Sequence, residues 1–377
     1  MSRRLSVLYV IDKLHRAGAQ IHLLQLVRGL DRSSFAPRVC CLLKGGPVAD
    51  EMRALGVEVE VLGLRTIYGS AAWRALPGLV REIRAHATDL VHTYLVSANI
   101  YGTLAARLAG APVLVTSRRD LGFSRNWRLR LVEEWLVNPR VDRVVAVSPS
   151  AAQAALGERG LDVHRVVTIP NGVDLVQYDP ARTSRADARS RLGLADDDSA
   201  VGVVAHLSSP VKGHADLLEA TARAATRWPR LKLLVVGEGA LRPALEAQAR
   251  ALGIEDRVSF TGALADMAEV LAALDLVVLP SHTEGMSNAL LEAMAMARPI
   301  VATAVSGNRD VLDDGRNALL APPHDPAALA EAMVRLLADG EEASRLGRAA
   351  RAKAESDFGL DRMVARYQDL YQELVHA

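Results

Sequence analysis

Short apolar segments alternate along the whole chain with longer segments in which apolar residues recur every three or four positions. The short segments have the length and continuous hydrophobicity of buried strands, and the longer ones have the period of amphipathic helices. This alternation is typical of βαβ units and parallel sheets. The predicted strands are residues 5–11, 38–43, 57–62, 90–94, 113–116, 143–147 and 166–169 in the first half, and 201–205, 232–236, 258–260, 276–279, 300–302 and 318–320 in the second. The predicted helices include residues 215–227, 240–252, 327–337 and 360–375.

The stretch from residue 170 to 199 separates the two series of strands. It contains an Asn-Gly pair, an Asp-Pro pair and three consecutive aspartates, which are typical of turns and loops. We therefore expect an α/β fold of two doubly wound parallel-sheet domains, residues 1–180 and 181–359, with a terminal helix over 360–377 packed on the first. Ligands of open α/β sheets bind beyond the carboxyl ends of the strands, so two such domains facing each other predict a cleft that holds the site.

Length and composition support this organisation. The 377 residues suffice for about two to three domains. Hydrophobic residues make up 50%, and 45 Lys+Arg against 44 Asp+Glu leave a net charge of +1, which argues against disorder and against a basic nucleic-acid-binding protein. Cys40 and Cys41 are adjacent within an apolar run, so we expect small buried hydrophobes in a reducing cytoplasm. The first apolar run ends at Ile11, which favours a buried strand over a signal peptide, and no apolar run reaches 18 residues.

The segment 280–294, PSHTEGMSNALLEAM, carries the clearest chemical signal. A predicted strand leads through a glycine-containing loop into a helix, where backbone N–H groups can hold an anion such as a diphosphate. These groups belong to Gly285, Met286, Ser287 and Asn288. Glu284 and Glu292 are separated by about 12 Å along a helix, too far for a glycosidase pair, which needs about 5 to 9.5 Å. They can contact two hydroxyl-bearing parts of one long ligand, or they are simply a loop carboxylate and an exposed helix residue.

This segment resembles the motif of two glutamates separated by seven residues in the retaining glycosyltransferases of family 4, two-domain enzymes with the GT-B fold. In that family the first glutamate faces the donor sugar and diphosphate and the second binds the ribose, so the resemblance implies these roles for Glu284 and Glu292. Further segments follow in the family's order and extend the resemblance over most of the chain. They are VVTIPNGVD (166–174), GVVAHLSSPVKGH (202–214), LVVGEGALR (234–242), VSFTG (258–262) and VSGNRDVLDDG (305–315).

The resemblance implies a hexosyltransferase-type enzyme that moves a sugar from a nucleotide-sugar donor, with retention at the anomeric carbon and without a metal cofactor. The acceptor would be a glycan or a lipid-linked sugar in cell-surface polysaccharide or glycolipid synthesis. The family grips the donor diphosphate with an Arg and, six residues later, a Lys. Lys212 matches the Lys, but His206 stands at the Arg position, and an imidazole is fully charged only below about pH 6.5. Gly237 opens a loop expected beside the nucleotide.

The first half departs from the family's pattern at its expected acceptor side. Its first turn keeps a single glycine, Gly18, at the start of a predicted helix, where N–H groups can meet a phosphate, and we expect Gly18 to help bind the donor. Arg118 stands where many relatives carry a catalytic-site histidine; a guanidinium cannot act as a base, so it would stabilise charge or position the acceptor. His92 resembles another cleft-facing position, and a satisfied buried histidine is the alternative.

Arginines and aromatic residues alternate within residues 121–137, including Phe123, Arg125 and Trp127. This pattern suits peripheral contact with the cytoplasmic face of the inner membrane, or an ordinary solvated helix with one apolar side. Three other functions fit parts of the sequence: a nucleotide-sugar epimerase of GT-B shape, a solute-binding protein, and a non-catalytic relative that only binds nucleotide sugars.

Overall fold

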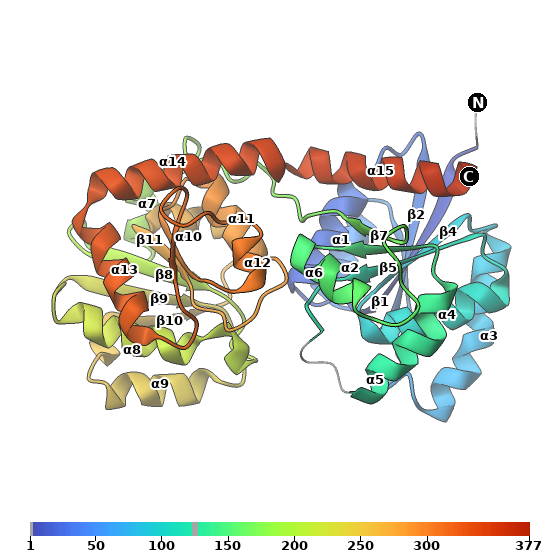
Figure 1. Ribbon diagram of the computed structural model, residues 1–377, viewed down its shortest axis with the longest axis horizontal. Helices are drawn as coiled ribbons and strands as arrows, with labels where there is room; N and C mark the ends of the chain where they lie inside the picture. Colours follow the sequence, from blue (N-terminus) through green and yellow to red (C-terminus); the bar gives the residue numbers. More distant parts are fainter. Residues whose placement is uncertain (1–2, 123–126) are drawn as a thin grey trace. The chain divides into compact units, whose positions relative to one another are not determined.

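The computed structural model describes residues 3–122 and 127–377. The chain forms two compact units, the first from Met1–Gly172 together with Leu360–Ala377 and the second from Val173–Gly359 (Figure 1). The first unit therefore ends at Gly172 rather than at residue 180, the boundary expected from the sequence. Turn-forming residues continue well past Gly172, so turn chemistry alone does not mark the residue at which the chain passes from one unit to the other.

The first unit is built on a seven-stranded parallel sheet with the order β3-β2-β1-β4-β5-β6-β7. This order is that of Rossmann-type sheets, in which the chain reverses direction between β1 and β4. The strands are β1 (Leu5–Lys13), β2 (Phe35–Lys44), β3 (Glu58–Val61), β4 (Leu90–Tyr94), β5 (Val113–Arg118), β6 (Arg143–Ala146) and β7 (Val166–Thr168). The helices are α1 (Gly18–Gly29), α2 (Pro47–Ala54), α3 (Ser70–Ala85), α4 (Val96–Ala109), α5 (Trp127–Val132), a π-helical turn (Glu133–Val137), a 3-10 turn (Asn138–Arg140), α6 (Pro149–Leu156) and α15 (Leu360–His376).

The second unit repeats the plan with a six-stranded parallel sheet in the order β10-β9-β8-β11-β12-β13. Its strands are β8 (Ser199–Val204), β9 (Leu231–Val236), β10 (Val258–Gly262), β11 (Leu276–Leu279), β12 (Ile300–Thr303) and β13 (Leu319–Ala321). The helices are α7 (Arg185–Arg191), α8 (His214–Ala225), α9 (Arg242–Ala251), α10 (Met267–Ala273), α11 (Asn288–Ala295), α12 (Ser306–Arg309), α13 (Pro326–Ala338) and α14 (Gly340–Asp357), with short 3-10 turns at Pro210–Lys212 and Glu255–Arg257.

Each predicted strand is present, and the prediction of two parallel-sheet α/β domains is confirmed. The 170–199 stretch, identified by its turn-forming residues, also contains a helix that was not predicted, α7. The sequence RADARSR hides this helix, since one of its two buried residues is Arg189, which no hydrophobic pattern reveals. Arg189 is held by ion pairing to Asp275 at 3.2 Å and by hydrogen bonds to backbone carbonyls.

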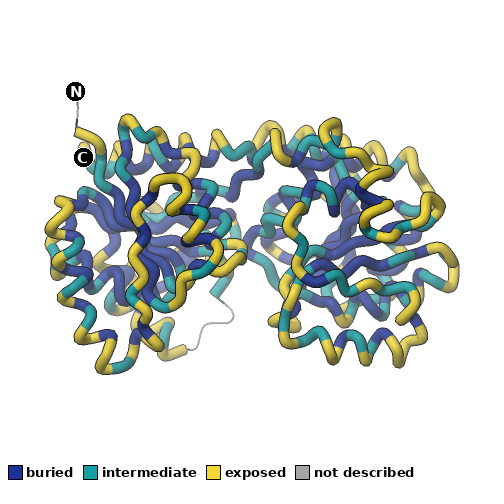
Figure 2. Tube along the Cα trace, turned by 180° about the vertical axis from the view of Figure 1, so that it is seen from behind, coloured by how far each residue is buried: buried dark blue, intermediate teal, exposed yellow. Residues whose placement is uncertain are grey.

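The cores show why the apolar segments are continuous. Most strands are buried along their length, as the dark segments of Figure 2 show, because helices cover both faces of a parallel sheet. Cys40 and Cys41 are both fully buried free thiols, as predicted, and alternation along β2 sends them into the cores on opposite faces of the sheet. On the Cys41 face, α15 contributes Tyr367 and Tyr371 to the core of the first unit.

Candidate active site

The donor-side residues predicted from the sequence lie on loops at the carboxyl edge of the second sheet. The loop after β8 carries His206 and Lys212, the loop after β9 carries Gly237, and the loop after β11 carries Glu284. Since β9, β8 and β11 are neighbours in one parallel sheet, these loops leave it at the same edge. This edge is where open α/β sheets bind their ligands.

Lys212 and Glu284 form the charged centre of this edge. The Lys212 ammonium donates to Oε2 of Glu284 at 2.6 Å, and the Ser281 hydroxyl donates to the same oxygen at 3.4 Å. The two side chains are 32% and 13% exposed, so both remain reachable while the carboxylate is largely enclosed. The backbone N–H of His282 donates to the carbonyl of Val211 at 2.7 Å, which fixes one loop against the other.

Glycine is required where these loops meet. Gly213 has a φ of +68°, and a Cβ on it would lie 1.9 Å from the carbonyl oxygen of Pro280. Gly237 has a φ of +145°, and its Cβ would lie 2.1 Å from the carbonyl oxygen of Ala205, beside the exposed His206. Backbone thus packs directly on backbone, which holds Lys212 next to the loop that carries Glu284.

Helix α11 begins at this loop and carries the second glutamate. Ser287 caps the helix by accepting from the N–H of Leu290 at 3.4 Å, and Met286 is buried, so its side chain serves the core. Glu292 is partly buried and hydrogen-bonded to Tyr178. Burial raises the pKa of Glu292 to about 7, and the hydrogen bond from Tyr178 opposes this rise. The alternative of an exposed helix residue is therefore wrong.

In the first unit, His92 is enclosed rather than exposed to a ligand. Its Nδ1 lies 2.7 Å from the hydroxyl of Tyr371 and its Nε2 lies 2.9 Å from the hydroxyl of Ser117. Burial lowers its pKa to about 3, with a smaller contribution from the charge of Arg119, so the ring is neutral. The structure thus favours the alternative of a satisfied buried histidine.

Arg118 differs most from its expected role. It is 3% exposed, lies 3.2 Å from Glu133 and from Glu158, and donates to Asn138 at 2.8 Å. It therefore holds the interior of the unit together and is not placed to position an acceptor. The reason is that successive side chains of a strand point to opposite faces of the sheet, so Arg118 points away from the face of its two neighbours.

Arg119, the residue after β5, takes the accessible position. It is partly exposed and donates to Asn171 at 2.7 Å, and burial lowers its pKa. Gly18 is exposed and opens α1 at the end of β1, as predicted for a helix start. The motif pointed to Arg118 and not to Arg119. Because successive side chains of a strand point to opposite faces, the two arginines lie in different surroundings.

Two family models of glycosyltransferases match this chain. The family described as "Glycosyltransferase Family 4" matches residues 16–177, and the family described as "Glycosyl transferases group 1" matches residues 198–339. A D-inositol 3-phosphate glycosyltransferase of Kineococcus radiotolerans is 33% identical over 330 residues, covering 79% of this chain and 75% of the relative. The chain belongs to glycosyltransferase family 4. The predicted family and the predicted enzyme class, a glycosyltransferase, are confirmed.

Solved structures of this glycosyltransferase's relatives agree with the fold. Anabaena HepE in complex with UDP-glucose superposes with a TM-score of 0.87 at 23% identity, covering 98% of this chain and all of that one (100%). WaaG, a glycosyltransferase involved in lipopolysaccharide biosynthesis, gives a TM-score of 0.77 at 17% identity, covering 97% and 99%. At these identities the likeness confirms the GT-B type of fold predicted from the sequence.

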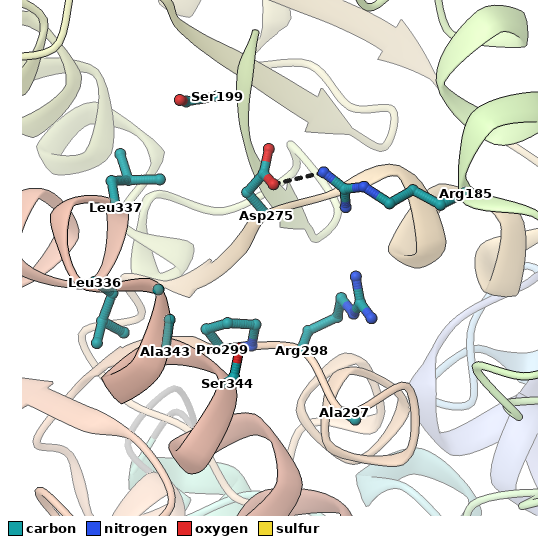
Figure 3. Close-up of a pocket in the computed structure, with 11 residues that line it drawn as sticks. Arg185, Ser199, Asp275, Ala297, Arg298, Pro299, Leu336, Leu337, Ala343 and Ser344 are labelled. Atoms are coloured by element: carbon teal, nitrogen blue, oxygen red, sulfur yellow. Dashed lines mark hydrogen bonds and ion pairs between the residues drawn. The ribbon is translucent and has the colours of Figure 1, made fainter. Parts of the chain in front are cut away.

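The second unit of the glycosyltransferase also has a cavity of about 290 Å³, whose lining residues Figure 3 shows. Its lining includes Ser199, Asp275 and Pro299, which lie at the starts of β8, β11 and β12. It therefore opens at the amino edge of the sheet, opposite to the edge where ligands bind. Arg185 donates to Asp275 at 2.5 Å, a pairing that ties α7 to the sheet. The rest of the lining comes mainly from α13 and α14, so the cavity lies between these helices and the amino edge of the sheet, away from the residues assigned to the donor.

Proposed function

We propose that this glycosyltransferase moves a sugar from a nucleotide-sugar donor to a hydroxyl of a glycan or lipid-linked acceptor, with retention at the anomeric carbon. The supporting observation is the Lys212–Glu284 pair, 2.6 Å apart at the carboxyl edge of the second sheet and next to the start of α11. The cation and the helix N–H groups can bind a diphosphate, and the carboxylate can accept hydrogen bonds from sugar hydroxyls at the same edge.

In the proposed reaction, the bond between the anomeric carbon and the diphosphate breaks, and its electron pair leaves on the phosphate oxygen. Lys212 and the N–H groups at 285–288 stabilise this developing charge, so the reaction needs no metal ion. The acceptor oxygen forms the new bond on the same face of the sugar. Its proton passes to the departing phosphate oxygen, because His92 is neutral and hydrogen-bonded on both nitrogens and Arg118 is not a base.

The nucleotide part of the donor is assigned to the rest of the same edge. Glu292, steadied by Tyr178, accepts hydrogen bonds from the ribose, while the backbone around Gly237 and the side chain of His206 border the base and phosphates. HepE binds UDP-glucose, which supports testing uridine nucleotides first. The first unit takes the acceptor, with Arg119 as its phosphate or hydroxyl contact.

We assign the place of action to the cytoplasmic face of the inner membrane, in the synthesis of a surface polysaccharide or glycolipid. Among the residues described, no helix is both long and apolar enough to span a bilayer. Within the predicted segment 121–137, residues 123–126, including Phe123 and Arg125, lie outside the described residues. The described part exposes four large apolar side chains, on Trp127, Leu131, Val132 and Trp135.

These apolar side chains lie at spacings of one helix face and are interleaved with cations. The guanidinium of Arg128 lies 5.4 Å from the Trp127 ring, and that of Arg159 lies 3.9 Å from the Trp135 ring. Aromatic side chains partnered by arginine suit the headgroup region of an anionic leaflet, where the rings enter the interface and the cations meet phosphates. An acceptor carried on a lipid would then be within reach.

The donor assignment is tested by thermal unfolding of the purified protein with UDP, GDP, ADP and CMP, followed by sugar derivatives of any nucleotide that binds. A ligand at one hundred times its Kd adds about 2.7 kcal/mol of stability. We expect one nucleotide to stabilise the protein, and Glu292→Ala to abolish the shift while Glu331→Ala, an exposed residue of α13, keeps it. Stabilisation by no nucleotide contradicts the proposal. Donor consumption that requires an added acceptor distinguishes a transferase from an epimerase.

A further inference from the structure

Two histidines and an aspartate from three separate segments meet in the second unit. Asp216 lies in the first turn of α8, His282 lies in the loop after β11, and His324 lies between β13 and α13. Their ligand atoms all lie within 4.8 Å of one another. No pair of them has the close spacing of a metal-binding motif, so the sequence alone predicted no metal site here.

The three side chains converge closely. The Nε2 of His282 lies 2.9 Å from Oδ2 of Asp216, and the Nδ1 of His324 lies 4.0 Å from the same oxygen. The two imidazole rings have centroids 3.7 Å apart, and their planes are tilted by 37°. His324 has a φ of +60°, an uncommon backbone conformation for a residue other than glycine. The His324 side chain remains 66% exposed and borders the partly buried Asp216 and His282 side chains.

These separations are those of a metal site that needs only small side-chain rotations. With bonds of about 2.0 to 2.1 Å, ligand atoms around a tetrahedral zinc ion lie about 3.3 Å apart. The 2.9 and 4.0 Å contacts bracket that value. Two imidazoles and one carboxylate favour Zn²⁺ or Co²⁺ over Mg²⁺ and Ca²⁺, which prefer oxygen ligands.

The geometry points to a binding site for a zinc-type divalent ion formed by Asp216, His282 and His324, with the fourth position open to water. The site lies beside the loops assigned to the donor. Asp216 follows Lys212 on the same loop and helix, and His282 precedes Glu284 by two residues, with its N–H bonded to the carbonyl of Val211 at 2.7 Å. A bound ion would link these loops to the turn at His324 and hold them in one arrangement.

The binding test uses untagged protein, stripped of metal by a chelator, and Zn²⁺ or Co²⁺ alone. Calorimetry should show one ion per chain at this site, and Co²⁺ should give the visible absorption bands of a four-coordinate site with nitrogen ligands. His324→Gly keeps the backbone conformation and removes one ligand, and Asp216→Asn removes the charge. We expect each to weaken binding at least about tenfold.

His86→Ala is the matched control, because Glu58, Glu82 and His86 form the other such group in the described part of the chain. This variant should bind the ion at the Asp216 site as the unchanged protein does. If Co²⁺ gives no such bands, or if its binding is the same in His324→Gly, the proposal is overturned and the contact between the two rings is packing alone.

The effect on the donor loops rests on the proposed function and is measured separately, as the Kd of UDP with and without Zn²⁺. We expect Zn²⁺ to tighten UDP binding in the unchanged protein and in His86→Ala but not in His324→Gly. Zinc binding that leaves the UDP Kd unchanged supports the metal site and overturns its link to the donor loops. Zinc binding in a protein that binds no nucleotide at all counts against the proposed donor site, not against the metal site.

Discussion

The Lys212 ammonium lies 2.6 Å from the Glu284 carboxylate, so the cation assigned to the donor diphosphate is held by the carboxylate assigned to the donor sugar. The contact orients both side chains at the sheet edge. A phosphate that approaches this edge meets an ammonium already in place, which lowers the cost of ordering a long side chain on binding.

Lys212→Ala should therefore reduce transfer. Loss of one charge-assisted hydrogen bond predicts a fall in kcat/KM of about ten- to a hundredfold, because such bonds contribute about 1.5 to 3 kcal/mol. Steady-state rates of donor consumption measure the effect. Lys353→Ala is the control, since Lys353 also pairs with a carboxylate in the second unit, Asp313 at 2.8 Å, and should leave the rate unchanged. Equal rates for the two variants would remove Lys212 from the site.

Glu292 predicts a dependence of stability on pH. Because burial raises its pKa from the ordinary value of 4.5 to about 7, the folded chain binds more protons than the unfolded chain between those values. Stability from this group is thus present at low pH and is lost as the pH rises from about 4.5 to 7. Glutamine imitates the protonated form, so Glu292→Gln should gain stability over the unchanged protein across this window, by about 3 kcal/mol at most.

Urea titrations at pH 4.5 and pH 8 measure that gain. Glu331→Gln serves as the control, because Glu331 is exposed and paired with Arg227 on the surface. The difference between Glu292→Gln and the unchanged protein should be larger at pH 8, and a difference that is the same at both pH values would show that Glu292 stays charged in the folded chain.

Substitution of Gly213 should cost more stability than its backbone conformation alone explains, because a Cβ there would also clash with neighbouring backbone. Gly193 has the same φ of +68° but nothing within 4 Å of its Cβ position, whereas Gly213 meets the carbonyl of Pro280. Gly193→Ala should cost about 1 to 2 kcal/mol for the left-handed conformation. Gly213→Ala should cost more and also weaken nucleotide binding, since the loop of Lys212 must shift. Thermal unfolding of both variants tests this, and equal losses would refute the backbone contact.

The exposed aromatic residues predict membrane binding. Replacing Trp127 and Trp135 by alanine should reduce sedimentation with vesicles of anionic phospholipid and have little effect with neutral ones. Trp73→Ala is the matched control, because Trp73 is 60% exposed on α3, close to the 66% and 58% of the other two. Equal sedimentation of the double variant and the control would leave the patch as ordinary surface.

The sequence predicted more of the fold than of the site. Continuous apolar strands and spaced turn residues identified both sheets, because burial in a parallel sheet imposes that pattern directly. It did not predict α7, whose buried side chain is an arginine, or the side to which Arg118 turns, because neither depends on hydrophobic periodicity. Tyr178 and the Asp216 group could not be found, since their partners come from distant segments that only folding brings together.

His206 provides the remaining prediction about the donor. Its side chain is exposed beside Gly237, so an arginine has room at this position without repacking the core. A guanidinium is always charged and can bind a phosphate with two parallel hydrogen bonds, a geometry that an imidazole cannot provide. His206→Arg should therefore tighten nucleotide-sugar binding at pH 8 by about tenfold. Calorimetric Kd values of the two proteins at pH 8 measure this, and an unchanged Kd would place His206 away from the phosphates.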